Sequence, residues 1–302
     1  MQLLEKLCNV HAPSGDESQM TSFLLNYINE NKSKWLVKPK LIYGEQFHDS
    51  VILVFGKPRT AVFSHIDSIG FSVGYNNEII KIGGPNVTEG DCLVGQDSHG
   101  YVEGNIYKDK SAIFIKFNRK IDRGTTLTFK VNFRETNDYI QSAYLDNRLG
   151  VYNCLQIAKN LKDGIIVFST YEEHGGGSVG FLGKYIYETY NVRQALISDI
   201  TWITSGVFHG KGCAISMRDS GIPRRSYVNR ILKLLSKSKI DYQIEVESAG
   251  GSDGNQLQKS SYPWDWCFVG AAEDNVHSPN EKVHKKDIKS MYKVYNYLLP
   301  RL

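Results

Sequence analysis

The sequence predicts an α/β fold, in which a mixed sheet is sandwiched by helices and a small β-rich domain is inserted. Strand-sized apolar runs alternate with helical patterns from residue 147 onward, which is typical of an α/β sheet. Residues 68–140 are rich in Gly, Thr, Val, Ile and Asn, alternate in polarity and show no long helical period. We therefore expect one α/β domain made of 1–67 and 141–302, with 68–140 as the inserted β domain.

The first 67 residues predict helices followed by two strands. Apolar residues at helical spacing occur within 1–35, interrupted by a Pro-Ser-Gly break at 13–15. Two apolar runs of strand length then follow, Val51–Phe55 and Thr60–His65. The Gly-Lys-Pro-Arg turn between them predicts that these two strands form a hairpin.

The second part of the chain predicts alternating helices and strands. Each apolar run of about six residues is followed or preceded by a segment with helical periodicity. Connections between parallel strands of such a sheet are right-handed. The expected helices cover 147–161, 177–190, 224–236 and 286–299, and the expected strands cover 164–170, 194–199, 213–218 and 241–247.

Composition excludes several classes of protein. The chain has 302 residues, 41% hydrophobic and 23% charged, which is typical of a globular protein. Its net charge is only +4, and no run of Lys and Arg is longer than two residues, so we expect no nucleic-acid partner. No apolar run approaches the ~20 residues of a membrane span, and no signal peptide is evident. The five cysteines form no CxxC motif and predict reduced thiols in a cytoplasmic protein.

Three predicted strands end in metal-ligating side chains. One run ends in His65 and Asp67, another in Glu172 and Glu173, and a third in Asp199. Taken singly, each residue has a commoner explanation, such as a hydrogen-bonded His, a solvated turn or a helix N-cap. Ligands of α/β sheets bind beyond the carboxyl ends of the strands, and carboxylates buried together there need compensating cations. The shared ending therefore predicts a metal site.

The spacing of these residues suggests separate roles. Residues two apart on a strand point to the same side, so Asp67 can accept a hydrogen bond from the ring nitrogen of His65 that does not face the metal. Glu172 and Glu173 diverge as neighbours, so one can ligate a metal while the other acts as a general base. Asp146, before a predicted helix, could bridge two ions, and His277 lies in a loop stiffened by a proline.

These segments resemble the glutamyl aminopeptidase (tetrahedral aminopeptidase) family of co-catalytic dinuclear metallopeptidases. The resemblance covers almost the whole chain and keeps the order His, Asp, Glu-Glu, Asp, His. The segments that carry it are Leu3–Glu17, Ala61–Val73, Ser142–Gly150, Val167–Gly180, Ala195–Thr201, Gly250–Leu257 and Asn275–Glu281.

The resemblance implies a role for each of these side chains. His65 and Asp199 would bind one metal, Glu173 and His277 the other, and Asp146 both. Glu172 would be the general base and Asp67 would support His65. The family also implies two divalent ions per chain and a cis peptide bond after the bridging Asp146. The mixed nitrogen and oxygen ligand set suits zinc first, with cobalt or manganese as alternatives.

The implied activity is that of an aminopeptidase that hydrolyses the N-terminal residue from unblocked peptides, in a homo-oligomer. Because only 81 positions separate His65 from Asp146, the insertion is compact and argues against a large tetrahedral assembly. The alternative is a related metal-dependent carboxypeptidase or N-acyl amino acid or peptide deacylase. Such relatives carry a lid domain after the fourth ligand, where this chain has only continuous α/β pattern.

A third hypothesis is a metal-stabilised interaction protein without catalysis, since 18 Tyr and 4 Trp could form partner surfaces. The presence of Glu172 beside a candidate ligand argues against it. No residue that binds the substrate side chain can be named from the sequence.

Overall fold

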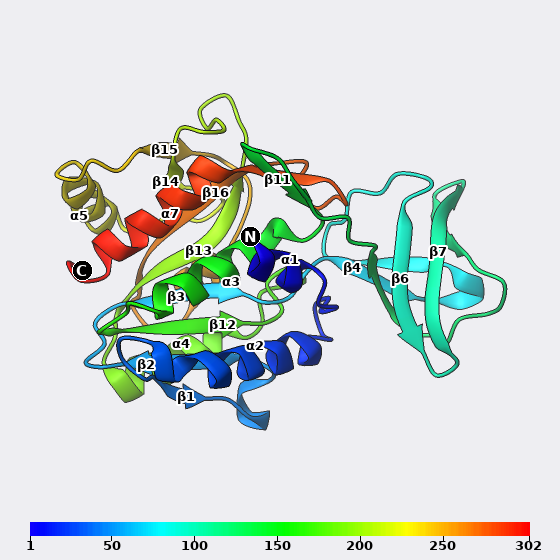
Figure 1. Cartoon of the computed structure of the whole chain (residues 1–302), viewed down its shortest axis with the longest axis horizontal. Coiled ribbons are helices and arrows are strands. Elements are labelled where there is room, and N and C mark those ends of the chain that lie inside the picture. The colour runs from blue at the N-terminus through cyan, green and yellow to red at the C-terminus, as the bar shows by residue number, and fades with distance from the viewer.

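The computed structural model describes residues 1–302 and contains two separate sheets (Figure 1). The larger sheet has eleven strands in the order β1-β2-β12-β3-β13-β16-β17-β11-β10, with β14 and β15 attached beside β16. Its strands are β1 (Lys40–Ile42), β2 (Val51–Phe55), β3 (Ala61–His65), β10 (Arg134–Glu135), β11 (Tyr139–Ser142), β12 (Gly164–Ser169), β13 (Gln194–Trp202), β14 (Cys213–Arg218), β15 (Tyr242–Val246), β16 (Asp265–Asp274) and β17 (Glu281–His284).

The centre of this sheet is parallel. β3 pairs in parallel with β12 and β13, with Phe63 opposite Val167 on one side and Ile197 on the other. β13 continues in parallel with β16. The carboxyl ends of β3, β12 and β13 therefore meet at one edge of the sheet.

Helices cover both faces of the larger sheet. β2 alternates between the two faces: Leu53 packs into the larger apolar core and Ile52 into the smaller one. The larger core contains residues of α1 (Gln2–Cys8), α2 (Ser18–Asn31), α3 (Leu145–Ala158), α5 (Arg225–Leu235) and α7 (Lys285–Leu298), and the smaller core contains residues of α4 (Val179–Tyr190) and α6 (Asp253–Lys259). This arrangement confirms the predicted mixed sheet between helical layers. No helix is both long and apolar enough to cross a membrane.

The smaller sheet extends to the right in Figure 1 and has its own apolar core. Its strand order is β5-β4-β9-β6-β7-β8. Phe71 and Phe129 meet edge to face inside it, with ring centroids 5.4 Å apart. The strands are β4 (Gly70–Val73), β5 (Ile79–Ile82), β6 (Cys92–Asp97), β7 (Gly100–Asp109), β8 (Ala112–Lys116) and β9 (Thr126–Phe129). The domain division at 68–140 stays a prediction: β4 to β9 form the smaller sheet, whereas β10 and the first residues of β11 belong to the larger sheet.

One local expectation about the larger sheet was wrong, and one of its strands was missed. β2 and β3 do not form a hairpin, because β12 lies between them, antiparallel to β2 and parallel to β3. The turn at 56–59 therefore reverses the chain across a strand that comes a hundred residues later. Strand β16 was not predicted at all, since Gly270, Ala271 and Ala272 weaken its strand propensity.

Candidate active site

The residues that carry the candidate chemistry lie at the carboxyl edge of the parallel strands. His65 ends β3, Glu172 and Glu173 follow β12, and Asp199 lies within β13. Asp146 lies in the first turn of α3, where its peptide bond to Asn147 is cis, as the resemblance implies. Helix α3 can approach β13 closely because residue 150 is glycine: a Cβ there would clash with the carbonyl oxygen of Ser198.

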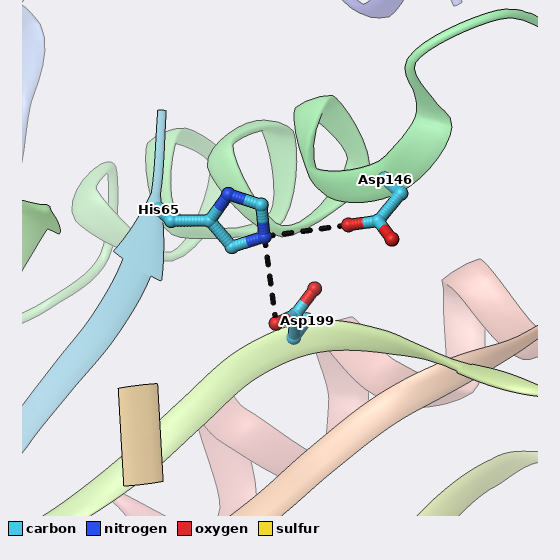
Figure 2. Close-up of side chains that lie close together, drawn as sticks. All are labelled: His65, Asp146 and Asp199. Carbon is cyan, nitrogen blue, oxygen red and sulfur yellow. Dashed lines mark ion pairs between the residues drawn. The ribbon is translucent and has the colours of Figure 1, made fainter. Parts of the chain in front are cut away.

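His65 lies between carboxylates from two other elements (Figure 2). Its Nε2 is 3.3 Å from Asp146 Oδ1 and 3.6 Å from Asp199 Oδ2. Glu172 is farther away, with Oε2 at 3.9 Å from the same nitrogen. The side chain of His65 is almost fully buried. One imidazole and two carboxylates thus form a compact donor group, and Glu172 flanks it.

A second donor group shares Asp146 with the first. His277, in the loop between β16 and β17, places Nε2 3.3 Å from Asp146 Oδ2 and 3.1 Å from Glu173 Oε2. The two oxygens of Asp146 therefore face different histidines. The sequence analysis singled out six residues as candidate ligands or base, and the structure brings all of them together. They are His65, Asp146, Glu172, Glu173, Asp199 and His277.

The donor groups fit divalent metal ions. Nitrogen and oxygen ligands at about 2.0–2.1 Å from a tetrahedral ion lie about 3.3 Å from one another, close to the spacings found here. Glu173 Oε1 is buried without a hydrogen-bond partner. Burial raises the pKa of Asp199 to about 6 and that of Glu173 to about 7, and a cation bound between these carboxylates would favour their ionised forms.

Asp67 connects two of the converging segments. Its Oδ1 lies 3.4 Å from His65 Nδ1, a long contact, and accepts the main-chain N–H of Glu172 at 3.1 Å. Its Oδ2 accepts the N–H of Glu173 at 3.0 Å and the hydroxyl of Ser14. Asp67 therefore faces the imidazole, as predicted, and also holds the backbone of the Glu172-Glu173 turn. The sequence analysis did not predict this second role.

Arg148 is another buried support that the sequence analysis missed. Its guanidinium has no exposed surface and donates to main-chain carbonyls of Ile66 and, at 3.3 Å, Val10. These bonds tie α3 to the chain just beyond β3. The Asp-Asn-Arg sequence that contains this arginine did not indicate such a role, because only the fold brings the two carbonyls within reach of the guanidinium.

Glu281 was also missed, although it lies only four residues beyond His277. It is completely buried; Oε1 accepts the N–H of His277 at 3.0 Å and Oε2 accepts the N–H of Asp146 at 3.2 Å. One carboxylate therefore fixes the backbone of two candidate ligands from distant parts of the chain.

Replacing Glu281 with Gln is expected to weaken metal binding about 10- to 100-fold, the usual cost of losing a group that hydrogen-bonds to metal ligands. An amide would turn an N–H donor toward one of the two backbone N–H groups. Competition with a metal chelator followed by metal analysis measures this effect. The exposed Glu30→Gln is the matched control, and unchanged affinity in Glu281→Gln would refute the positioning role.

Comparison with known proteins decides the family. Residues 116–294, more than half of the chain, match the model of the M42 glutamyl aminopeptidases. The chain belongs to the M42 glutamyl aminopeptidase family. A protein of Acetivibrio thermocellus that carries a provisional aminopeptidase name is 24% identical over 332 aligned positions, covering 97% of this chain and 96% of that protein.

Solved structures share the fold over the full length. An aminopeptidase from the archaeon Desulfurococcus kamchatkensis superposes with a TM-score of 0.87 at 20% identity, covering 100% of this chain and 94% of that one. The TET1 peptidase of Pyrococcus horikoshii, described as assembling into a tetrahedron or an octahedral shell, gives 0.84 at 22% identity, covering 100% and 99%.

Membership in the M42 family confirms the predicted resemblance and the predicted activity. The chain is a metal-dependent aminopeptidase, a hydrolase of peptide bonds. The carboxypeptidase or deacylase alternative is not favoured by this membership.

Proposed function

We propose that this M42 aminopeptidase removes the N-terminal residue from unblocked peptides with two divalent cations bound side by side. The observation that carries the proposal is the position of Asp146, whose two oxygens each lie 3.3 Å from a different imidazole Nε2. His65 and Asp199 would complete one cation site, and Glu173 and His277 the other. The mixed nitrogen and oxygen set suits zinc, with cobalt or manganese as alternatives.

When bound, the two cations would lower the pKa of a water molecule and polarise the scissile carbonyl. The protein supplies the remaining steps. Glu172 lines the cavity over both donor groups, and its carboxylate would take a proton from the attacking water and pass it to the leaving amine. Asp67 and Glu281 would keep the ligands and the base in position through the backbone hydrogen bonds described above.

We also propose that the chain acts in the cytoplasm as a homo-oligomer. Its five cysteines are unpaired. The Pyrococcus horikoshii peptidase is described as assembling into a tetrahedron or a large octahedral shell, whereas the compact insertion of this chain argues for a smaller assembly. Light scattering on the purified protein measures the state; a monomer would contradict the proposal.

A pair of peptides tests the activity. The metal-loaded enzyme is expected to release the first residue of a peptide with a free amino terminus and to leave its N-acetylated copy intact, because the free amine is the group recognised. Amino-acid release is followed by mass spectrometry, with the metal content measured on the same sample. Equal cleavage of both peptides would instead support the deacylase or carboxypeptidase alternative.

Removing the metal with a chelator is expected to abolish release, and adding back zinc, cobalt or manganese to restore it. Metal analysis of the active protein should give two ions per chain. One ion per chain at full activity would contradict the paired site.

A further inference from the structure

The cavity over the two donor groups has a second acidic wall. It encloses about 260 Å³ and reaches past the candidate ligands to Asp219, Glu245 and Glu247. Asp219 follows β14, whereas Glu245 and Glu247 belong to β15 and the residues after it. Asp219 and Glu245 are buried and Glu247 is half-buried. This second wall comes from elements that supply none of the candidate ligands.

The charges of this cavity do not balance without a further cation. Seven carboxylates line it, and no lysine or arginine does. Two divalent ions would balance four of them, namely Asp146, Glu172, Glu173 and Asp199. The carboxylates of Asp219, Glu245 and Glu247 then remain, and no lysine or arginine within the cavity pairs with them.

The protein supplies one positive charge near these carboxylates but no ion pair to them. The charge of Arg218 lowers the pKa of Asp219, but the Nε–H of Arg218 donates to the main-chain carbonyl of Asp219 at 3.1 Å rather than to the carboxylate. Burial raises the pKa of Glu245, and the charges of Asp219 and Glu247 raise it further, so each of these two carboxylates repels that of Glu245. A cationic group bound among them would relieve that repulsion.

The second wall lies within reach of a substrate held at the donor groups. Glu245 accepts a hydrogen bond from the hydroxyl of Thr201, and Thr201 is two residues beyond Asp199 on β13. Residues two apart on a strand point to the same side and are about 7 Å apart. Trp202 and Phe268 line the same cavity and offer apolar surface there.

We propose that this wall binds the side chain of the residue to be removed and selects lysine and arginine. The proposal rests on the aminopeptidase function proposed above. Lysine carries an ammonium on a four-carbon stem, so the stem can lie along the apolar surface while the charge meets the carboxylates. A glutamate side chain would be repelled, and a neutral one would leave the three carboxylates unpaired.

A panel of N-terminal residues tests this selectivity. The metal-loaded enzyme is assayed with aminoacyl coumarylamides of lysine, arginine, norleucine and glutamate. Norleucine has the stem of lysine without its ammonium, so the lysine-to-norleucine ratio of kcat/KM isolates the charge. We expect a ratio of about 10- to 100-fold, as for hydrogen bonds to a charged group, and the weakest turnover with glutamate. A ratio near one, or a preference for glutamate, would overturn the proposal.

Neutral variants of the wall locate the effect. Glu247→Gln, Glu245→Gln and Asp219→Asn are expected to lower the lysine-to-norleucine ratio toward one, whereas the exposed Glu45→Gln keeps it. Because the ratio is taken within each variant, a partial loss of metal or of folded protein cancels. An unchanged ratio in all three wall variants would overturn the assignment. Half-buried Glu247 is the variant least expected to disturb folding.

Binding separates this inference from the proposed function. If no coumarylamide is cleaved, the aminopeptidase proposal fails. Binding of a basic side chain by the second acidic wall is then tested by calorimetry, which measures the affinities of lysinamide and norleucinamide for the metal-loaded protein. Tighter binding of lysinamide, lost in Glu247→Gln, supports a site for a basic side chain. Equal binding of the two amides, which would result if the wall held only the α-amino group, overturns it.

Discussion

Glu172→Gln is expected to leave both cations bound and to lower kcat by about 10²- to 10⁴-fold, the usual contribution of a positioned general base. The reason is geometric: Glu172 Oε2 is the most distant of the carboxylate oxygens around His65, at 3.9 Å, while Asp146 and Asp199 are nearer. An amide of the same shape cannot take the proton from water. Metal content and turnover are measured on the same preparation.

Its neighbour Glu173 gives the matched contrast. Glu173 Oε2 lies 3.1 Å from His277 Nε2, so Glu173→Gln is expected to reduce the metal content as well as turnover. Near-normal turnover of Glu172→Gln would refute its role as base. Loss of metal in Glu172→Gln and its retention in Glu173→Gln would mean that the two roles are exchanged.

Asp146→Asn is expected to lose both cations and essentially all activity. Each Asp146 oxygen faces a different histidine, so the substitution removes the negative charge shared by both donor groups and turns an N–H₂ group toward one of them. Metal analysis after dialysis, together with circular dichroism to verify the fold, measures the effect.

Asp199→Asn is the control for this prediction, because Asp199 lies near only His65 among the two candidate imidazole ligands. It is expected to weaken one cation and leave the other. If Asp146→Asn loses a single ion per chain, as Asp199→Asn should, then Asp146 does not bridge.

Several elements of the larger domain could be predicted from the local hydrophobic pattern of the sequence. The expected strand 213–218 coincides with β14, and the helix expected at 286–299 differs from α7 by one residue at each end. Such segments are predictable because their burial on one or both faces imposes a period on their own residues. The hairpin failed for the opposite reason: adjacency in a sheet depends on β12, a strand distant in sequence from the turn at 56–59.

The candidate site shows the same division. His65, Glu173 and Asp199 could be named because each follows or ends a strand-like run and carries a metal-binding group. Glu281 could not, since a buried carboxylate that accepts two backbone N–H groups has no local pattern of its own. The second acidic wall could not be predicted either, because Asp219 follows β14 and Glu245 lies on β15, and only the sheet topology places β14 beside β16 and β15 beside β14.

The order of residue types along this chain was enough to establish the α/β class, the family and the side chains expected to hold cations. These depend on composition, period and short motifs, which any segment carries by itself. Which carboxylates share a cavity, and which lack a counter-ion there, was decided only by the folded chain. Electrostatic energy depends on distance and burial in space, and neither can be obtained from separation along the sequence.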